Sequence, residues 1–381
     1  VFCFLGLLAV LYTASAQSYT FNHGPYLQEL SEHAVTFVFT TSDKGFSWVE
    51  VKPDGGEAER HYTVRNGLRD AYNTFNVIRV ENLRPDTRYQ YRLCSKQIAD
   101  FQPYKVTFGD SIVSPWRRFS TPDPKATACS FIALSDMHQQ PDKLGRLLNQ
   151  AGVGSADMIF YVGDMMNYYD NEETPFRSFI DKSVELFASE KPFVLVRGNH
   201  ETRGNMAREY ARYVPKSSGK YYGAYRVGDI MFIVLDCGED KPDDFWVYAG
   251  LTDFDGYRTE QAAWFGELIR SKAYKSAKWR IVMNHFPPLS HMESDNPERH
   301  GIQDITDKFL PLYNQAKIDL MISGHTHAYE FMSPDKYDRL TFPVIVNSTE
   351  SVARIDIDGR TLKAKVTDTG GNTLKEFTIS K

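Results

Sequence analysis

The sequence predicts an all-β sandwich followed by a larger α/β region, and two patterns indicate this division. Between residues 19 and 120, short apolar or alternating runs are separated by Asp, Gly and Pro turn clusters, as in antiparallel sheets. Beyond residue 124, apolar runs alternate with amphipathic helical stretches, as in sheets covered on both faces. We therefore expect domains at residues 17–124 and 125–381, joined by the stiff sequence around Pro122 and Pro124.

In the first region, strands are expected at residues 35–41, 48–51 and 72–80, with turns at 53–56 and 65–67. The sequence from Leu83 to Arg92 contains a Leu-x-Pro-x-Thr-x-Tyr corner and resembles fibronectin type III domains. The opening Gly-Pro-Tyr-Leu-Gln, residues 24–28, resembles the N-terminal domain of purple acid phosphatases. An immunoglobulin- or fibronectin-like sandwich fits this region.

In the second region, short apolar runs predict six buried strands, at residues 130–134, 158–162, 193–196, 231–235, 280–283 and 320–322. Helices are expected at residues 143–150, 175–187 and 259–269, the last with a Thr259 cap. After residue 343 the pattern is all-β again, with Asp358 and Gly359 in a hairpin turn. Cys129 and Cys237 lie in apolar runs and are expected to be free, buried thiols.

The first sixteen residues have the pattern of a secretory signal peptide. An apolar run over residues 1–11 is followed by the small-residue site Ala14-Ser15-Ala16, which predicts cleavage after Ala16 and a secreted or periplasmic protein. A buried N-terminal strand or a retained anchor is the alternative, and no transmembrane segment is expected after cleavage. The 44 basic and 49 acidic residues give a net charge of -5, which disfavours a nucleic-acid polymer as partner.

Polar side chains follow five of the six predicted strands. These strand ends carry Asp136 and His138, Asp164, Asn199 and His200, His285, and His325 and His327. Because α/β sheets place ligand sites at the carboxyl ends of their strands, we expect these side chains to meet. A single histidine of this kind is usually a core or loop residue, but five such strand ends in one chain favour a site.

The residue types predict a dinuclear metal centre. Oxygen and imidazole ligands without a thiolate suit Fe, Mn or Zn better than Ca and exclude a Cys-rich structural zinc site. Seven side chains suffice for two ions with open positions: Asp136, His138, Asp164, Asn199, His285, His325 and His327. Gly163, Gly198 and Gly324 precede three of these residues and are expected to allow sharp backbone turns.

The motif order Asp-x-His, Gly-Asp, Gly-Asn-His-Glu, His and Gly-His-x-His resembles the calcineurin-like dinuclear metallophosphoesterase superfamily. With the N-terminal region, the chain resembles a secreted metallophosphatase of the purple acid phosphatase type. The resemblance implies a sandwich of two mixed sheets flanked by helices. It places Asp136, His138 and His327 on one ion, Asn199, His285 and His325 on the other, Asp164 between them and His200 at the scissile phosphoester.

The sequence departs from the family pattern at one position. Purple enzymes have a tyrosine three residues after the bridging aspartate, and its phenolate on ferric iron gives the colour. Here Asn167 occupies that position and Tyr168 comes one residue later, while the first motif carries His138, which purple enzymes lack. We expect His138 to replace the phenolate and the site to be colourless.

The resemblance further implies hydrolysis of phosphate monoesters by in-line attack of a metal-bound hydroxide, with His200 as general acid or hydrogen-bond donor. Glu201 is a candidate to orient His200, and Arg203 is either a phosphate clamp or an exposed arginine. Asn167 and Tyr168 either contact substrate or form the pocket wall.

Two loops are expected to be solvated surface, the alternatives being a substrate lid for the first and a histidine that reaches the leaving group for the second. The first, residues 237–258, carries Asp243, Asp244, Asp253 and Asp255, and the second carries His291 and His300.

Two other functions fit the same sequence. A phosphodiesterase or nucleotidase would use the same ligands on a different substrate. More remotely, the sandwich suggests a non-catalytic adhesion or carbohydrate-binding protein with an inactive phosphoesterase domain. Loss of ligands would support that function, but all seven and His200 are present.

Overall fold

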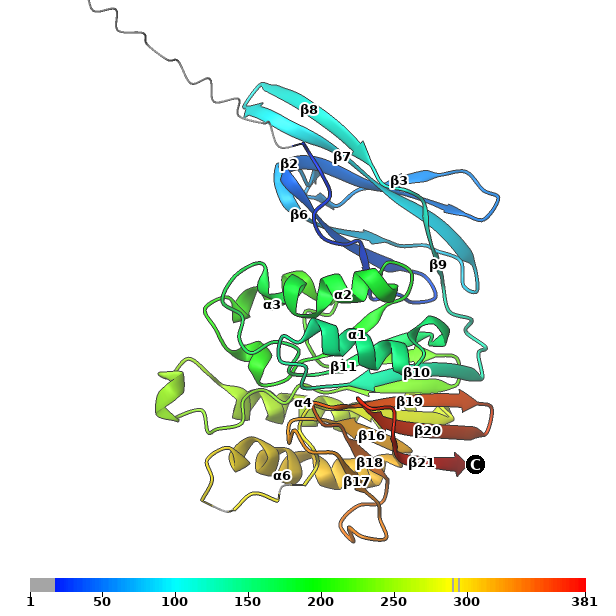
Figure 1. Cartoon of the computed structure of the whole chain (residues 1–381), viewed down its shortest axis with the longest axis vertical. Helices are drawn as coiled ribbons and strands as arrows, with labels where there is room; N and C mark the ends of the chain where they lie inside the picture. The colour runs from blue at the N-terminus through cyan, green and yellow to red at the C-terminus, as the bar shows by residue number, and fades with distance from the viewer. Residues whose placement is uncertain (1–17, 290, 294) are drawn as a thin grey trace, which may run out of the picture.

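The computed structural model describes residues 18–289, 291–293 and 295–381 (Figure 1). The expected signal peptide lies outside these residues. Among the helices of the described part, none has both the length and the apolar character needed to cross a bilayer.

The N-terminal region is built around one long strand, whose two halves pair with different strands of a seven-stranded sheet. The strands are β1 (Tyr26–Gln28), β2 (Val35–Pro53), β3 (Glu59–His61), β4 (Val64–Arg65), β5 (Leu68–Arg69), β6 (Asn73–Val80), β7 (Arg88–Gln102), β8 (Lys105–Val113) and β9 (Arg117–Ser120). The first half of β2 pairs with β1 and β6, and its second half pairs with β3 and β7. The two separate strands expected at residues 35–41 and 48–51 form one continuous strand, β2. Its pairing register with β6 shifts between Thr40 and Gly45.

Apolar side chains from both halves of β2 form a common core. Phe37 from the first half and Val49 from the second are fully buried and belong to the same cluster as Ile78 and Tyr91. The two arms of the sheet therefore pack face to face, as expected for a β-sandwich.

The N-terminal region packs against helices of the second region (Figure 1). The Tyr26 hydroxyl donates to the Tyr213 carbonyl oxygen at 2.8 Å. The His23 ring lies 3.0 Å from Asp181 and 3.1 Å from Glu173, and it stacks on Phe176. Burial lowers the pKa of His23, but the two carboxylates outweigh burial and raise it above its usual value.

The second region contains two six-stranded mixed sheets. The first has the order β12-β11-β10-β19-β20-β21 and the second β13-β14-β15-β16-β18-β17. The strands are β10 (Ala128–Leu134), β11 (Met158–Val162), β12 (Phe193–Val196), β13 (Gly223–Val227), β14 (Ile230–Val234), β15 (Trp279–Met283), β16 (Leu320–Ser323), β17 (Glu330–Met332), β18 (Val344–Val346), β19 (Ser351–Asp358), β20 (Thr361–Asp368) and β21 (Thr373–Ser380). All six predicted strands and the terminal hairpin are confirmed.

The two sheets pack on each other and helices cover their outer faces. Phe131 and Phe160 of the first sheet meet Phe232 of the second in a shared core. The helices are α1 (Pro141–Gln150), α2 (Asp181–Ser183) within a helical segment over residues 176–188, α3 (Tyr210–Tyr213), α4 (Phe254–Leu268), α5 (Lys272–Ser276) and α6 (Arg299–Ala316). Residues of α1 and the segment 176–188 pack on the first sheet, and α4, α5 and α6 pack on the second. The predicted fold class is therefore confirmed, and Cys129 and Cys237 are free and buried as expected.

Two of the longer helices differ from the prediction, and the short helices α3 and α5 were not predicted. Helix α4 begins at Phe254 instead of residue 259, because both carboxylate oxygens of Asp243 accept the first backbone N–H groups, those of Phe254 and Asp255. Helix α6 was not predicted, since its first turns are polar and Pro311 interrupts the periodic pattern.

The loop after β14 is only in part the solvated acidic surface that was expected, because Asp244 and Asp253 are exposed whereas Asp243 and Asp255 are engaged. Asp243 caps α4, and Asp255 lies 2.5 Å from Arg258 and 2.8 Å from His300 at the start of α6. Asp255 thereby links α4 to α6. His300, expected as an unliganded surface histidine, is part of this helix contact.

Candidate metal centre

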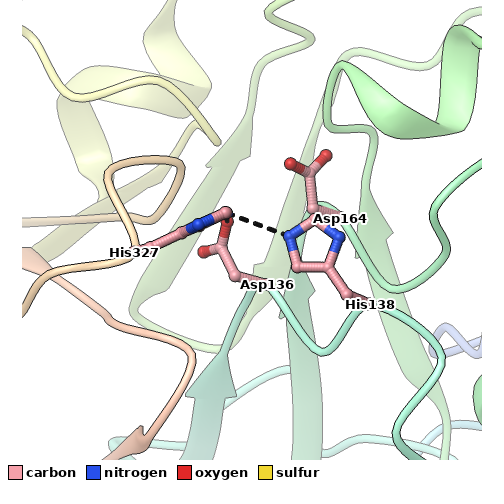
Figure 2. A group of neighbouring side chains, drawn as sticks. All are labelled: Asp136, His138, Asp164 and His327. Carbon is pink, nitrogen blue, oxygen red and sulfur yellow. Dashed lines mark hydrogen bonds and ion pairs between the residues drawn. The ribbon is translucent and has the colours of Figure 1, made fainter.

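The polar side chains at the strand ends converge where the two sheets meet. Figure 2 shows Asp136, His138, Asp164 and His327 pointing toward one another from the loops after β10, β11 and β16. In one group, Asp136, His138, Asp164 and His327, the potential ligand atoms lie within 4.8 Å of one another. A second group with the same spacing consists of Asp164, His285 and His325. Asp164 belongs to both groups, so the geometry is that of two adjacent cation sites with a shared carboxylate.

The backbone around these side chains is strained. Positive φ angles occur at Asp136 (58°), His138 (45°), Asp164 (56°), His325 (73°) and His327 (57°). Each such residue costs of order 1–3 kcal/mol, and strain of this kind persists where function requires a side-chain direction. These residues lie two to four residues after the ends of β10, β11 and β16. The turns therefore hold their side chains near the carboxyl ends of these strands.

Glycines let the loops approach one another closely. A Cβ atom on Gly198 would lie 2.2 Å from Asp164 Oδ1, and one on Gly324 would lie 2.4 Å from Asp136 Oδ2. On Gly163 it would lie 2.3 Å from His285 Nδ1. Only Gly163 of the three has a positive φ, 89°, so the expected sharp turn occurs there and the other two glycines serve close packing.

The second group is buried and contains polar atoms without partners. His285 is fully buried, and its Nδ1–H donates to the Val162 carbonyl oxygen at 2.6 Å, which leaves Nε2 without a proton in the neutral ring. This Nε2 lies 3.0 Å from Asp164 Oδ2. In this group and neighbouring Asn199, four buried atoms have no hydrogen-bond partner: Asp164 Oδ2, Asn199 Oδ1, His285 Nε2 and His325 Nε2.

A cation would resolve this arrangement. An unpaired buried polar atom costs about 1–3 kcal/mol, and all four of these atoms can act as metal ligands. Burial, together with neighbouring His285, lowers the pKa of His325 to about 3, so His325 is in the neutral form that binds metals. For His285, burial lowers the pKa, but Asp164 and Asp136 outweigh it and raise it to about 10, so without a bound cation its Nε2 holds a proton that faces Asp164, and a metal ion would replace that proton. These residues therefore fit a metal ion.

The first group is more open to solvent. The His327 side chain is 52% exposed and its Nε2 lies 3.5 Å from Asp136 Oδ1. His138 Nε2 lies 3.0 Å from His327 Nε2, the contact drawn as a dashed line in Figure 2. Burial lowers the pKa of His138 to about 4, which keeps this imidazole neutral as well.

Asn167 holds two of the histidines. Its Oδ1 accepts from His138 Nδ1 at 3.1 Å, its Nδ2 donates to Gln139 Oε1 at 3.1 Å, and its carbonyl oxygen accepts from His200 Nδ1 at 2.8 Å. Both polar atoms of the side chain are engaged within the protein, which favours the pocket-wall alternative over a substrate contact. The Tyr168 side chain, by contrast, is 55% exposed.

Glu201 lies beneath the site and does not contact His200. It is fully buried, and its Oε2 accepts the backbone N–H groups of Asp164 and Gly198 at 2.9 and 2.8 Å. Its Oε1 accepts from the N–H of Met165 at 2.7 Å. The candidate role in orienting His200 is therefore not supported, because the carboxylate instead joins the loops after β11 and β12. Burial, reinforced by Asp164, raises the pKa of Glu201 to about 7.

Arg203 lies beside His200 and is fixed by two carboxylates that the sequence interpretation missed. Its Nε and Nη2 lie 2.9 Å from the two oxygens of Glu239, and Nη2 lies 3.1 Å from Asp240. Its Nη1 donates to His200 Nε2 at 3.0 Å. Glu239 and Asp240 are buried and follow β14, the one predicted buried strand whose polar end was not considered.

These residues border a cavity of about 740 Å³. Its walls include Asp164, Asn199, His200, Arg203, His325 and His327. His291 is exposed, as expected, and lies at the edge of this cavity 3.3 Å from Glu330. A small molecule in the cavity would therefore contact both candidate ligand groups, His200 and a guanidinium.

The calcineurin-like phosphoesterase family matches residues 129–329, which is more than half of the chain. The chain belongs to this family. It is 22% identical over 277 residues to purple acid phosphatase 21 of Arabidopsis thaliana, covering 69% of this chain and 55% of that protein. It is 25% identical over 237 residues to acid phosphatase type 7 of Danio rerio, covering 56% of this chain and 50% of that protein. The chain thus spans about half the length of the curated relatives it matches.

The fold also matches a solved structure. The purple acid phosphatase from yellow lupin (Lupinus luteus) seeds superposes with a TM-score of 0.67 at 15% identity, over 93% of this chain and 74% of that chain. The match extends beyond residues 129–329 into the N-terminal region, so both parts of this chain share the fold of that enzyme.

Proposed function

We propose that this protein is a secreted phosphomonoesterase with a dinuclear metal centre. Family membership and the two candidate ligand groups that share Asp164 support a metal-dependent phosphoesterase. One ion would be held by Asp136, His138 and His327, the other by Asn199, His285 and His325, with Asp164 between them. Bound ions of the Fe, Zn or Mn type supply a water of lowered pKa and neutralise charge on phosphoryl oxygens.

His200 is the proposed proton donor to the leaving oxygen. Its Nδ1–H donates to the Asn167 carbonyl and its Nε2 accepts from Arg203, so Nε2 would have to take up a proton and part from Arg203 before it donates to the leaving oxygen. This Nε2 lies 3.9 Å from Asp164 Oδ2, which places it beside the candidate ligands.

The single observation that favours a monoester is the fixed position of Arg203. A phosphate monoester carries two negative charges near neutral pH, whereas a diester carries one. The guanidinium of Arg203 is already paired with Glu239 and Asp240, so its contribution would be the Nη1–H donor at the His200 end of the cavity, which would bind the additional anionic oxygen of a monoester.

The test compares matched substrates on metal-loaded protein. We expect kcat/KM for phenyl phosphate to exceed that for diphenyl phosphate, and Arg203→Ala to lower the monoester value about 100-fold with a smaller effect on the diester. Arg146→Ala, on the exposed face of α1, is the control and should change neither value. A diester preference that survives Arg203→Ala would favour a phosphodiesterase, and no hydrolysis of any monoester, diester or nucleotide would favour a binding protein.

We also propose that export removes residues 1–16 and that residues 17–124 and 125–381 are separate domains. The sequence pattern of the leader and the sandwich supports this organisation. N-terminal sequencing of protein recovered from the medium or periplasm should begin at Gln17, and retention of the first residues would contradict the cleavage site.

A further inference from the structure

A second cavity adjoins the candidate metal centre. It has a volume of about 1090 Å³, and Arg203 lies in the walls of both cavities. Its floor contains the half-buried rings of Tyr221, Phe254 and Tyr257, around the guanidinium of Arg197. The ion pair of Arg197 with buried Asp236 fixes this floor next to the loop that carries Asn199.

Two exposed apolar side chains line this cavity, beside charged side chains such as Arg203 and Lys220 that are paired with Glu239 and Glu260. Within the described part of residues 125–381, the large exposed apolar side chains are Tyr168, Trp246, Val247, Leu251 and Leu374. All but Leu374 lie in the loops that follow β11 and β14, and both of these loops carry residues of the candidate centre. Val247 is 45% exposed, Leu251 is 69% exposed, and both line the second cavity.

These loops are joined to one another and to the candidate centre. The backbone N–H of Tyr169 donates to the Arg203 carbonyl oxygen at 2.7 Å, which places Tyr168 beside Arg203. The Tyr248 hydroxyl lies 3.1 Å from Glu239, the carboxylate that holds Arg203. The loop that carries Val247 and Leu251 is therefore anchored to Glu239, which lines the second cavity and holds Arg203. The side chains of Val247 and Leu251 remain partly exposed at this cavity.

From this arrangement we propose that the second cavity binds the alcohol portion of the substrate and that this portion is bulky and apolar. The inference rests on the proposed function, because the phosphoryl group is taken to lie at the metal centre. When an apolar group covers apolar side chains beside a reactive centre, it removes their surface from water, which lowers the free energy of the complex. A small or strongly polar alcohol would leave Val247, Leu251 and the aromatic floor in water.

The test uses ethyl phosphate and octyl phosphate, whose leaving alcohols have similar acidity but differ in apolar length. Each methylene removed from water improves binding about fourfold, so burial of about three of them gives octyl phosphate a kcat/KM about 50-fold higher. Octyl phosphate is used well below the concentration at which it forms micelles. Leu251→Ser should lower this ratio several-fold, whereas Leu374→Ser, which removes an exposed leucine from β21, should leave it unchanged.

Binding of ethylphosphonate and octylphosphonate, measured by calorimetry, separates this inference from the proposed function. Stronger binding of octylphosphonate that weakens in Leu251→Ser supports the cavity assignment even if neither phosphate ester is hydrolysed. Equal binding of the two phosphonates, or a preference unchanged by Leu251→Ser, overturns it even if both esters are hydrolysed.

Discussion

The two candidate ligand groups are built from the same residue types but differ in their access to water. His285 is fully buried with Nε2 unpaired, whereas the His327 side chain is 52% exposed and its Nε2 contacts another imidazole. In the buried group, the cation is needed to satisfy atoms that have no other partner. In the open group, water and neighbouring side chains can take its place. We therefore expect the two sites to retain their ions unequally, although their ligands are of the same residue types.

The largest effect is expected from Asp164, the one side chain common to both groups. Asp164→Ala should abolish the binding of both ions and reduce hydrolysis by well over 100-fold, since even the loss of an outer hydrogen bond to a ligand costs 10–100-fold in metal affinity or activity. Metal content per chain after dialysis, by elemental analysis, checks this result. Asp335→Ala, an exposed carboxylate outside both groups, is the control. Retention of full activity by Asp164→Ala would contradict the shared site.

The next prediction concerns the order in which the ions leave. A chelator should remove the metal in two phases, with the faster phase from the open group. His327→Ala should eliminate the fast phase and His285→Ala the slow phase, with elemental analysis at each time point as the measurement. A single phase in the wild-type protein, or the opposite assignment, would show that burial does not govern retention.

A smaller effect is expected from Asn167, which contacts only one ligand group through its side chain. Asn167→Ala should weaken binding of one ion by about 10–100-fold, because His138 loses the acceptor that fixes its ring, and should leave the other ion in place. Metal titration of the apo-protein gives both affinities, and Tyr168→Ala serves as the neighbouring control. Equal weakening of both ions would place Asn167 outside the first group.

The smallest expected signal is the absence of colour. With Asn167 at the position of the purple enzymes' tyrosine, protein loaded with ferric iron should lack an intense visible tyrosinate band. An absorption spectrum of the loaded protein decides this, and an intense band would show that a phenolate, instead of His138, completes the open group.

The sequence was most informative for the buried strands and for the polar residues at their carboxyl ends. Apolar runs revealed the strands, and the rule that strand ends meet brought together residues as distant as Asp136 and His327. It failed for β2, because a strand that bends through a polar stretch appears as two. Helix α6 was missed for a similar reason, since polar first turns and Pro311 hide its periodicity.

The direction of individual side chains was beyond the sequence. Nothing in the order Asn-His-Glu indicates that His200 faces a cavity while Glu201 points into the protein toward three backbone N–H groups. Likewise, Arg203 is fixed by Glu239, which is 36 residues away, so its position depends on tertiary contacts. Glu239 and Asp240 could have been found by extending the strand-end rule to β14.

The buried carboxylate of Glu201 has a consequence for how fast the protein takes up its ions. It fixes the loops after β11 and β12 through hydrogen bonds that involve no metal. The apo-protein therefore presents Asp164 and Asn199 in place before an ion arrives, and little loop rearrangement stands between encounter and capture. Loading of the ion held by Asp164 and Asn199 should then be a single bimolecular step whose rate rises in proportion to the metal concentration. If a loop had to fold around the ion, the rate would instead reach a limit that does not depend on the metal concentration.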